Sequence, residues 1–575
     1  MMFPEPRIFH PPYSTIYESS PYSENDLIKP DSDYFTSLGY VYIGQESRGL
    51  QGSGGNYSFW RTAGNDSLDT ILWWKTYSQG WGNGQLAVAG ISADCITQYA
   101  DVTGVTQSGY WPNGNYSYFE DLFRYIRTGV LALGSALGRQ TVFQGGAYRQ
   151  GLVSGWLQDL GEAQMIQTIW EHEAWDYWWY PLQGSYENQW AMYNTTAINF
   201  AGWYDIFSSP QIWTVDAVNT TAQPGARGQQ LLFVDPGGHC VIGDIPWVED
   251  LLGWEYMLAE IAPLVLARVF ESSLNGKPFN VHDYVDWNVF FYVLGPGIIE
   301  TGLFWVKAES FPPFTNTNWY FAPGGKLSPS QPTSTTSTVT TYKYDPFNPV
   351  PTWGGNNLII QPCGPQNQNV VESNRTDVLH FDSANITDTF ALVGMISVNL
   401  FVSSSAPDTD FTAKLIDIFP DGRAMLVQDS IIRMRWRNGP FSTQNAPPMQ
   451  SNETYNVTID VGFMSYIFNA GHKIRVSISS SNYPRFSANY NSGLNMIYGN
   501  KSAQVAMNSI HYGSILNPSH VTLPIVSLQW LEDRKVVLED LHEKLDEREQ
   551  EWKNLGFDIK RFARDMKKKI FNKKL

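Results

Sequence analysis

Gln85-Leu-Ala-Val-Ala-Gly-Ile-Ser92 is the stretch of this chain that decides its fold class. The apolar run is typical of a buried strand, and Ile96-Thr-Gln-Tyr-Ala100 behind it has a spacing compatible with a helix. A serine on the tight turn between such a strand and such a helix points its hydroxyl out of the sheet. The next backbone N–H, that of Ala93, is then placed to stabilise an oxyanion. A Gly-x-Ser turn alone is weak evidence for a catalytic serine. The assignment of Ser92 therefore depends on the strands and helices predicted around it.

Apolar runs alternate with helical spacing on both sides of this turn. Before the turn, the sequence predicts a strand at 39–44 and a helix at 66–77. After it, strands are predicted at 197–201 and 230–234, with a helix at 212–218 between them. Strand–helix–strand alternation implies a parallel sheet with right-handed crossovers. We therefore predict an α/β domain over residues 1–325.

An insertion is predicted to interrupt this sheet at about residues 116–190. Its composition changes to a Trp-rich stretch near 170–179, and apolar residues recur at helical intervals at Leu122, Tyr125, Ile126, Val130 and Leu133. We expect this segment to form a helical cap over the sheet.

An aspartate and a histidine, the two residue types that activate a catalytic serine, follow the later strands. Asp205 comes just after the strand at 197–201, and His239 comes just after the strand at 230–234. Since the carboxyl ends of parallel strands share one edge of a sheet, Ser92, Asp205 and His239 are expected to meet there. The order Ser, Asp, His is that of α/β-hydrolases, in which the histidine takes the serine proton and the aspartate orients the imidazole.

The second half of the chain changes character. A polar Ser/Thr/Pro tract at 328–341 is typical of a loop, and the period-2 segments beyond it, such as 396–402 and 473–478, predict an all-β sandwich at 326–530. In the final segment, 531–575, apolar residues recur in steps of three and four, which predicts an amphipathic helical tail.

Composition excludes some classes of function. The net charge of −17 argues against a nucleic-acid partner, because phosphate binding requires clustered Lys and Arg. The most apolar stretches are shorter than the roughly 18–20 residues that span a bilayer, so no transmembrane helix is expected. The three cysteines, Cys95, Cys240 and Cys363, are too few for a disulfide framework.

The sequence leaves two cellular locations possible, the cytoplasm and the outside of the cell. The first residues lack the apolar core of a signal peptide, which favours the cytoplasm. Ten Asn-x-Ser/Thr sequons, which arise by chance or as glycan sites in a secreted chain, point the other way, at Asn56, Asn65, Asn115, Asn194, Asn219, Asn374, Asn385, Asn452, Asn456 and Asn500.

Several motifs together resemble one family, the cocaine-esterase-like hydrolases related to Xaa-Pro dipeptidyl-peptidases, across nearly all of residues 7–530. In the first half these are Gln45-Glu-Ser-Arg-Gly49, Trp81-Gly-Asn-Gly84, Gly202-Trp-Tyr-Asp205 and Asp235-Pro-Gly-Gly-His239. In the second half, segments beginning at Asp408, Pro420 and Gly471 resemble the jelly-roll domain of that family. The resemblance implies an α/β-hydrolase domain with a cap, followed by a β jelly roll, and no metal or cofactor.

The chain departs from the family pattern at two places. The first is the tight turn that carries Ser92, the nucleophile elbow. After the serine it has Ala93-Asp94-Cys95, where the family has a tyrosine and a second glycine. The family also takes a second oxyanion donor from a tyrosine after an early strand, for which Tyr13 and Tyr22 are the candidates; the apolar-to-Pro context before Tyr13 favours it. So few residues precede that turn that the chain resembles a form lacking its N-terminus, and a missing leader would favour secretion.

The resulting expectation is an acyl hydrolase that cleaves a small-molecule ester, an amide or a short peptide through an acyl-enzyme on Ser92. A first alternative is an Xaa-Pro dipeptidyl-peptidase, whose substrate amine would need an acidic group in the cap, such as Glu171, Glu173 or Asp176. A second is an impaired pseudoenzyme or a carbohydrate-binding protein, suggested by the altered elbow. Cys95 is a weaker candidate nucleophile, and a homo-oligomer remains open.

Overall fold

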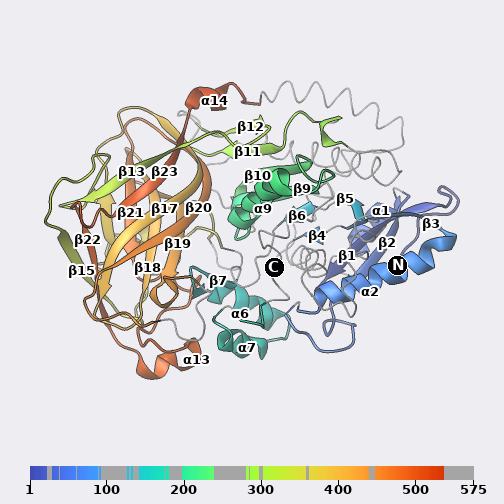
Figure 1. Cartoon of the computed structure of the whole chain (residues 1–575), viewed down its shortest axis with the longest axis horizontal. Helices are drawn as coiled ribbons and strands as arrows, with labels where there is room; N and C mark the ends of the chain where they lie inside the picture. The colour runs from blue at the N-terminus through green and yellow to red at the C-terminus, as the bar shows by residue number, and fades with distance from the viewer. Residues whose placement is uncertain are drawn as a thin grey trace.

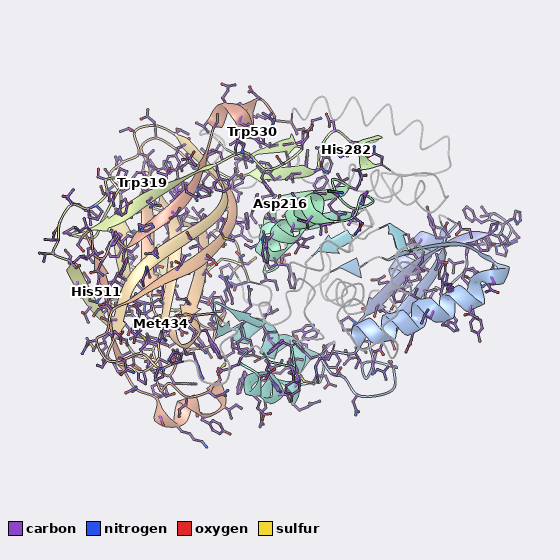
Figure 2. All side chains as sticks on the ribbon, viewed as in Figure 1. Asp216, His282, Trp319, Met434, His511 and Trp530 are labelled. Carbon is purple, nitrogen blue, oxygen red and sulfur yellow. The ribbon has the colours of Figure 1, made fainter. Side chains whose placement is uncertain are left out.

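A computed structural model of the chain describes residues 1–21, 29–37, 39–59, 61–88, 90–91, 126–128, 131–133, 142–174, 176–179, 197–238, 280–283, 285–296, 302–357, 362–439 and 447–536. An α/β region occupies one end of the molecule and a β-rich domain the other (Figure 1). Asp216 and His282 lie in the α/β region, whereas the β-rich domain contains Trp319, Met434, His511 and Trp530 (Figure 2).

Four parallel strands form the N-terminal sheet, in the order β2-β1-β3-β5. They are β1 (Tyr13–Ser20), β2 (Val41–Glu46), β3 (Gly82–Val88) and β5 (Ile126–Thr128). Helix α1 (Lys29–Ser37) connects β1 to β2, and α2 (Ala63–Tyr77) with the 3-10 turn η2 (Ser78–Gly80) connects β2 to β3. All residues of β1 are buried, as expected for a strand flanked on both sides.

Six strands form the next sheet, in the order β12-β11-β10-β9-β6-β4. All neighbours in it are parallel except the antiparallel pair β11 and β12. The strands are β4 (Gly90–Ile91), β6 (Leu131–Leu133), β9 (Ala197–Tyr204), β10 (Gln230–Gly238), β11 (Val289–Val293) and β12 (Phe304–Ala308). Because β4 follows β3 after one residue and β6 follows β5 after two, the two sheets are consecutive parts of one strand series. The helix α9 (Ser208–Thr221) connects β9 to β10, and η6 (Val281–Asp283) precedes β11.

The strands expected at 39–44, 197–201 and 230–234 and the helices expected at 66–77 and 212–218 are confirmed. The helix expected at 96–100 lies outside the described residues, and one stretch of the predicted insertion is wrong. Residues 126–128 and 131–133, expected in a helix, are β5, which pairs with β3, and β6, which lies between β4 and β9. The apolar residues there also satisfy a strand period, and pairing with strands on both sides decides between the two patterns.

The described part of the cap begins after this strand pair. It contains the hairpin β7 (Phe143–Gln144) and β8 (Ala147–Tyr148), followed by α6 (Gln150–Asp159) and α7 (Met165–Glu171). An aromatic cluster holds the two helices together, with Trp178 stacked on Phe59 and Trp179 fully buried. Phe59 belongs to the segment after β2, so the cap packs directly on a loop of the N-terminal sheet.

The β-rich domain is built on an 11-stranded sheet, mostly antiparallel. Its two longest strands, β17 and β20, pair along most of their length. The strands are β13 (Thr315–Ala322), β14 (Lys326–Ser328), β15 (Thr338–Tyr344), β16 (Leu379–Asp382), β17 (Phe390–Ser404), β18 (Asp410–Ile418), β19 (Ala424–Arg433), β20 (Tyr455–Phe468), β21 (Lys473–Ser479), β22 (Ala506–Tyr512) and β23 (His520–Val526). Short helical turns complete it: α12 (Asn369–Glu372), η7 (Met434–Trp436), α13 (Met496–Gly499), η8 (Asn500–Ser502) and α14 (Leu528–Glu532).

One hydrophobic core runs from the α/β sheet into the β-rich domain. It joins residues of β9 to β12, such as Phe233 and Trp305, to residues of the large sheet, such as Leu392 and Tyr466. Leu294, just after β11, also exchanges backbone hydrogen bonds with Ser465 and Ile467 of β20. The α/β region and the β-rich domain therefore share one core and are packed directly against each other.

Three sequence expectations bear on the rest of the chain. Of the helical tail predicted at 531–575, the part beyond residue 536 lies outside the described residues. Cys363 is disulfide-bonded, which three cysteines allow although they are too few for a disulfide framework. In the described portion, no helix combines the length and the apolar character required to cross a bilayer.

Candidate functional site

The predicted catalytic residues follow three parallel strands of one sheet. Ser92 comes directly after β4, Asp205 directly after β9, and His239 directly after β10. Strands β9 and β10 are neighbours, and β6 lies between β9 and β4. Ser92, Ala93 and His239 are themselves outside the described residues, as are Cys95 and Tyr22, so the geometry of the site is given by Asp205 and by the strand ends.

Asp205 is held in one conformation by its own turn. Only 3% of the residue is exposed. Its carboxylate oxygen Oδ1 accepts the backbone N–H of Phe207 at 2.9 Å, and its own N–H donates to the carbonyl of Gly202 at 2.9 Å. Its carbonyl accepts the N–H of Ser208, the first residue of α9, at 3.2 Å. One carboxylate oxygen is thus engaged by the turn, which fixes the direction of the other.

Two glycines allow the ends of β9 and β10 to approach closely. A Cβ atom on Gly202 would lie 2.5 Å from the carbonyl oxygen of Gly237, and one on Gly238 would lie 2.7 Å from that of Tyr204. The pairing of the strands shifts register between Asp235 and Gly238. Asp235 shapes that bulge by accepting the N–H of Gly237 on Oδ1 at 2.6 Å. The Gly-Trp-Tyr-Asp and Asp-Pro-Gly-Gly-His motifs therefore form one interlocked pair of strand ends.

The two aromatic residues of the first motif anchor β9. The Trp203 indole N–H donates to the carbonyl of Tyr292 in β11 at 2.7 Å. The Tyr204 hydroxyl donates to the carbonyl of Leu426 in β19 at 3.3 Å. Burial raises the pKa of Tyr204, so this hydroxyl keeps its proton at neutral pH. Asp205 therefore follows a strand end that is fixed on both sides.

The motif at 45–49 lies at the carboxyl end of β2, on the same edge of the sheet. Gln45 Oε1 accepts hydrogen bonds from the hydroxyls of Tyr17 at 2.8 Å and Thr70 at 2.5 Å. Arg48 forms a forked ion pair with Asp66 in α2. Gly49 has a positive φ of 78°, and a Cβ atom there would strike the backbone N of Tyr57. This motif shapes the loop that carries Tyr57 and Phe59 to the cap.

Tyr13 is at the wrong end of its strand for an oxyanion donor. It is the first residue of β1 and pairs with Gly82 at the amino end of β3. At a rise of about 3.3 Å per residue, the six steps from Gly82 to Val88 alone place Tyr13 about 20 Å from the edge where Ser92 follows. Its hydroxyl donates to the carbonyl of Phe9 at 3.1 Å. The apolar-to-Pro context that favoured Tyr13 marks the start of a strand and not its end.

The cap contributes a buried cation to the surroundings of Asp205. Arg149, the residue before α6, is 6% exposed, and its Nε and Nη1 groups have no hydrogen-bond partner among the residues that the structure describes. Its pKa is lowered to about 9 by burial and by the charge of Arg485, against the opposing carboxylates of Asp205 and Asp429. Arg149 therefore remains largely protonated at neutral pH, with N–H groups suited to a carbonyl or carboxylate oxygen.

The acidic residues proposed for an amine subsite in the cap have structural partners. Glu173 is buried and pairs with Arg435 of the β-rich domain at 3.2 Å. Asp176 pairs with His172 at 2.6 Å, and Glu171 accepts a hydrogen bond from Gln167. Two other histidines, His380 and His472, contact Glu372 and Asp417 respectively, so they are structural as well.

Sequence reasoning did not identify the residues of the β-rich domain that reach this edge. The side chain of Asn356 donates from Nδ2 to the carbonyl oxygen of Asp205 at 3.1 Å. Beside it lies a buried ion pair, Asp429 with Arg485 at 2.6 Å. No periodicity or spacing in the sequence connects residues 151 positions apart, and only the Gly354-Gly355 pair before Asn356 marked a special turn.

Comparison with known proteins gives two family matches. Residues 5–107 match the model of the X-Pro dipeptidyl-peptidase (S15 family), and residues 285–521 match the X-Pro dipeptidyl-peptidase C-terminal non-catalytic domain. The chain is 30% identical to the cocaine esterase of Rhodococcus sp. (strain MB1 Bresler) over 537 residues, which cover 86% of this chain and 89% of that protein.

Solved structures agree on the fold. An aminopeptidase from the marine sediment archaeon Thaumarchaeota archaeon superposes with a TM-score of 0.69 at 18% identity, covering 90% of this chain and 92% of that one. An α-amino acid ester hydrolase gives a TM-score of 0.67 at 21% identity, with coverages of 90% and 92%. The architecture is therefore that of an α/β-hydrolase with a C-terminal β-rich domain.

The close approach of β9 and β10 predicts the effect of a single methyl group. Gly202→Ala forces the two strand ends apart, because backbone atoms occupy the space of the new Cβ, and should lower the free energy of unfolding by about 1–3 kcal/mol. Gly80→Ala, where no atom lies within 4 Å, should change it by less than about 0.5 kcal/mol. Denaturant unfolding of both variants measures the difference. Equal stabilities would show that the strand ends are not tightly interlocked.

Proposed function

Because the chain belongs to the cocaine-esterase-like hydrolases related to the X-Pro dipeptidyl-peptidases, we propose that it is a serine hydrolase whose nucleophile is Ser92. The reaction is cleavage of an ester or amide bond through an acyl-enzyme. The substrate is a small-molecule ester or amide or a short peptide. The observation that carries the proposal is the buried Asp205, fixed at the end of β9 beside the strand that leads into His239.

The steps follow from the order of the strand ends. His239 takes the proton of the Ser92 hydroxyl as the oxygen attacks the substrate carbonyl, and later returns it to the leaving group. Asp205 holds the imidazole in the required tautomer and stabilises the imidazolium. The turn bond from Phe207 fixes the carboxylate through Oδ1, which supports this orienting role because Oδ2 is then directed by the same turn.

The oxyanion is proposed to be stabilised by the backbone N–H of Ala93 and by the hydroxyl of Tyr22. The Ala93 donor does not depend on its side chain, so the altered elbow sequence preserves it. Tyr22 comes two residues after Ser20, the last residue of β1, and therefore follows a strand at the edge where Ser92 follows β4. This position replaces Tyr13 in the assignment.

An esterase or acylase is favoured over an Xaa-Pro dipeptidyl-peptidase by the partners of the cap acids. Glu173 is engaged in an ion pair with Arg435 and Asp176 in a hydrogen bond with His172, and an acid engaged in this way is a poor acceptor for a substrate α-amine. Arg149 adds a positive charge close to Asp205, which also disfavours a cationic substrate group there. A neutral or anionic acyl substrate fits these surroundings better.

The assignment of the nucleophile is tested with an active-site label. Ser92→Ala should abolish labelling by a fluorophosphonate and hydrolysis of a short-chain ester, since Ser92 is the proposed nucleophile. Ser53→Ala, in the loop after β2, should retain both. Gel fluorescence of the labelled proteins, together with p-nitrophenyl acetate hydrolysis, gives the comparison. Labelling of Ser92→Ala at the wild-type level would identify a different nucleophile, and labelling of neither wild type nor variant would favour a pseudoenzyme.

The second oxyanion donor is tested by removing one hydroxyl at a time. Tyr22→Phe should lower kcat by ~10²–10³, with little change in KM, because the donor acts on the developing oxyanion. Tyr13→Phe should keep a wild-type kcat, since that hydroxyl contacts the carbonyl of Phe9 at the far end of β1. Steady-state kinetics of the two variants decide the assignment, and the reverse pattern would contradict the strand register described above.

A further inference from the structure

We propose that Asn356 is a positioning residue for Asp205, so that the β-rich domain takes part in building the catalytic site. This inference rests on the proposed function of Asp205 and extends it. The family model that matches residues 285–521 is described as non-catalytic, yet this region supplies the side chain that donates to the Asp205 carbonyl. Asn356 does not contact the reacting atoms, and its role is to hold the turn that carries the carboxylate.

The hydrogen bond fixes the peptide group that follows Asp205. The Asp205 carbonyl accepts two N–H groups, from Ser208 in its own turn and from Asn356 across the domain boundary. The bond from Ser208 lies within the turn itself. The bond from Asn356 fixes the turn to a different part of the molecule, the β-rich domain. Because Ser208 still satisfies the carbonyl when Asn356 is changed, loss of the second bond should loosen the orientation of Asp205 without unfolding the turn.

The segment that presents Asn356 is rigid. Gly354 and Gly355 both have a φ of +80°, a conformation that residues with a side chain rarely adopt. Backbone hydrogen bonds join Gly355 and Gly364 in both directions, at 2.7 and 3.0 Å. Cys363, next to Gly364, is disulfide-bonded. Asn356 itself is only 9% exposed. A side chain held by so many constraints is able to fix another group in place.

A buried ion pair supports this segment from behind. A Cβ atom on Gly355 would lie 2.5 Å from Asp429 Oδ1 and 2.7 Å from Arg485 Nη1, so the backbone is pressed against that pair. Asn482 donates to the other oxygen of Asp429 at 2.7 Å. The side chains of Asp429 and Arg485 are 2% and 3% exposed. Charges buried to this degree are costly to move, so the pair acts as a fixed platform for Asn356.

The same platform is connected to the cap. Gln144 of β7 donates to the hydroxyl of Ser430, next to Asp429, at 2.9 Å. The N–H of Arg433, also in β19, donates to the carbonyl of Gly145 at 2.8 Å. The cap hairpin is therefore bonded to strand β19. The Asp205 turn contacts the same strand through the segment of Asn356, which packs on the Asp429–Arg485 pair. A shift of β19 would change the position of Asp205 and of the cap together.

The test compares substitutions at Asn356 with one at an asparagine that makes a similar bond elsewhere. Asn399 donates to the hydroxyl of Thr458 at 3.2 Å on the exposed face of the large sheet, so Asn399→Ala is the control. Asn356→Ala should lower kcat for p-nitrophenyl acetate by roughly ten- to hundredfold, as expected for misplacement of a catalytic group, while KM changes less than about threefold. The rate of fluorophosphonate labelling should fall in parallel, and Asn399→Ala should match wild type in each measurement.

A purely structural role is separated from positioning by the pH profile. Asn356→Asp keeps the size of the side chain but replaces the donor with a carboxylate near the site. A new negative charge beside the carbonyl of Asp205 raises the pKa of the imidazolium that Asp205 is proposed to orient, so the acidic limb of kcat/KM should move to higher pH. Asn356→Gln keeps the amide and should recover part of kcat. A structural role alone would reduce the melting temperature and leave the pH profile and kcat per folded molecule unchanged.

The outcomes distinguish this inference from the proposed function. A wild-type kcat in folded Asn356→Ala, with Ser92→Ala inactive, would overturn the positioning role and leave the serine hydrolase intact. Full labelling of Ser92→Ala would instead overturn the proposed function. Failure of all three Asn356 variants to fold, shown by circular dichroism, would assign Asn356 to stability and also overturn the inference.

Discussion

The rest of the site depends on the contact between the backbones of β9 and β10 at their carboxyl ends. Gly202 lies so close to the carbonyl of Gly237 that no side chain fits between them. This approach, together with the bulge that Asp235 shapes, sets where the chain leaves the sheet on each strand. Asp205 and the segment of His239 therefore start from neighbouring points, and the chemistry proposed for them follows from a steric condition on two glycines.

The β-rich domain is connected to that edge by more than apolar packing. Tyr204 donates to β19, and Asn356 holds the carbonyl of Asp205. Behind both lies the Asp429–Arg485 pair, which is buried and whose partners would be costly to separate. The β-rich domain therefore donates a hydrogen bond to the backbone of a proposed catalytic residue.

Much of the α/β part was predictable because its signals are local. The apolar runs that became β2, β3, β9 and β10, and the Gly-rich turns that end them, can be identified in short windows. Residues 126–128 and 131–133 were predicted wrongly as helical because spacing alone does not distinguish a helix from short strands that gain their stability from neighbouring strands. Tyr13 was misassigned because its context was judged without the direction of β1.

The parts of the site that the sequence did not predict all depend on long-range contacts. Asn356 and Asp205 are 151 positions apart, and Arg149 enters the surroundings of Asp205 only through the cap. Buried polar residues of this kind follow no period, and their role appears only when their partners are known. The family motifs identified the strand ends, whereas the support behind them required the three-dimensional arrangement.

The most direct test of this account is the rate of Asp205→Asn. The substitution preserves the size of the side chain and the acceptor for the Phe207 N–H but removes the charge that orients and stabilises the histidine. The account predicts a loss of kcat of about 10⁴ with an unchanged melting temperature, whereas Asp216→Asn, at an exposed position of α9, the helix that follows, should behave as wild type. A kcat of folded Asp205→Asn within tenfold of wild type would contradict the central claim that the end of β9 supplies the catalytic acid.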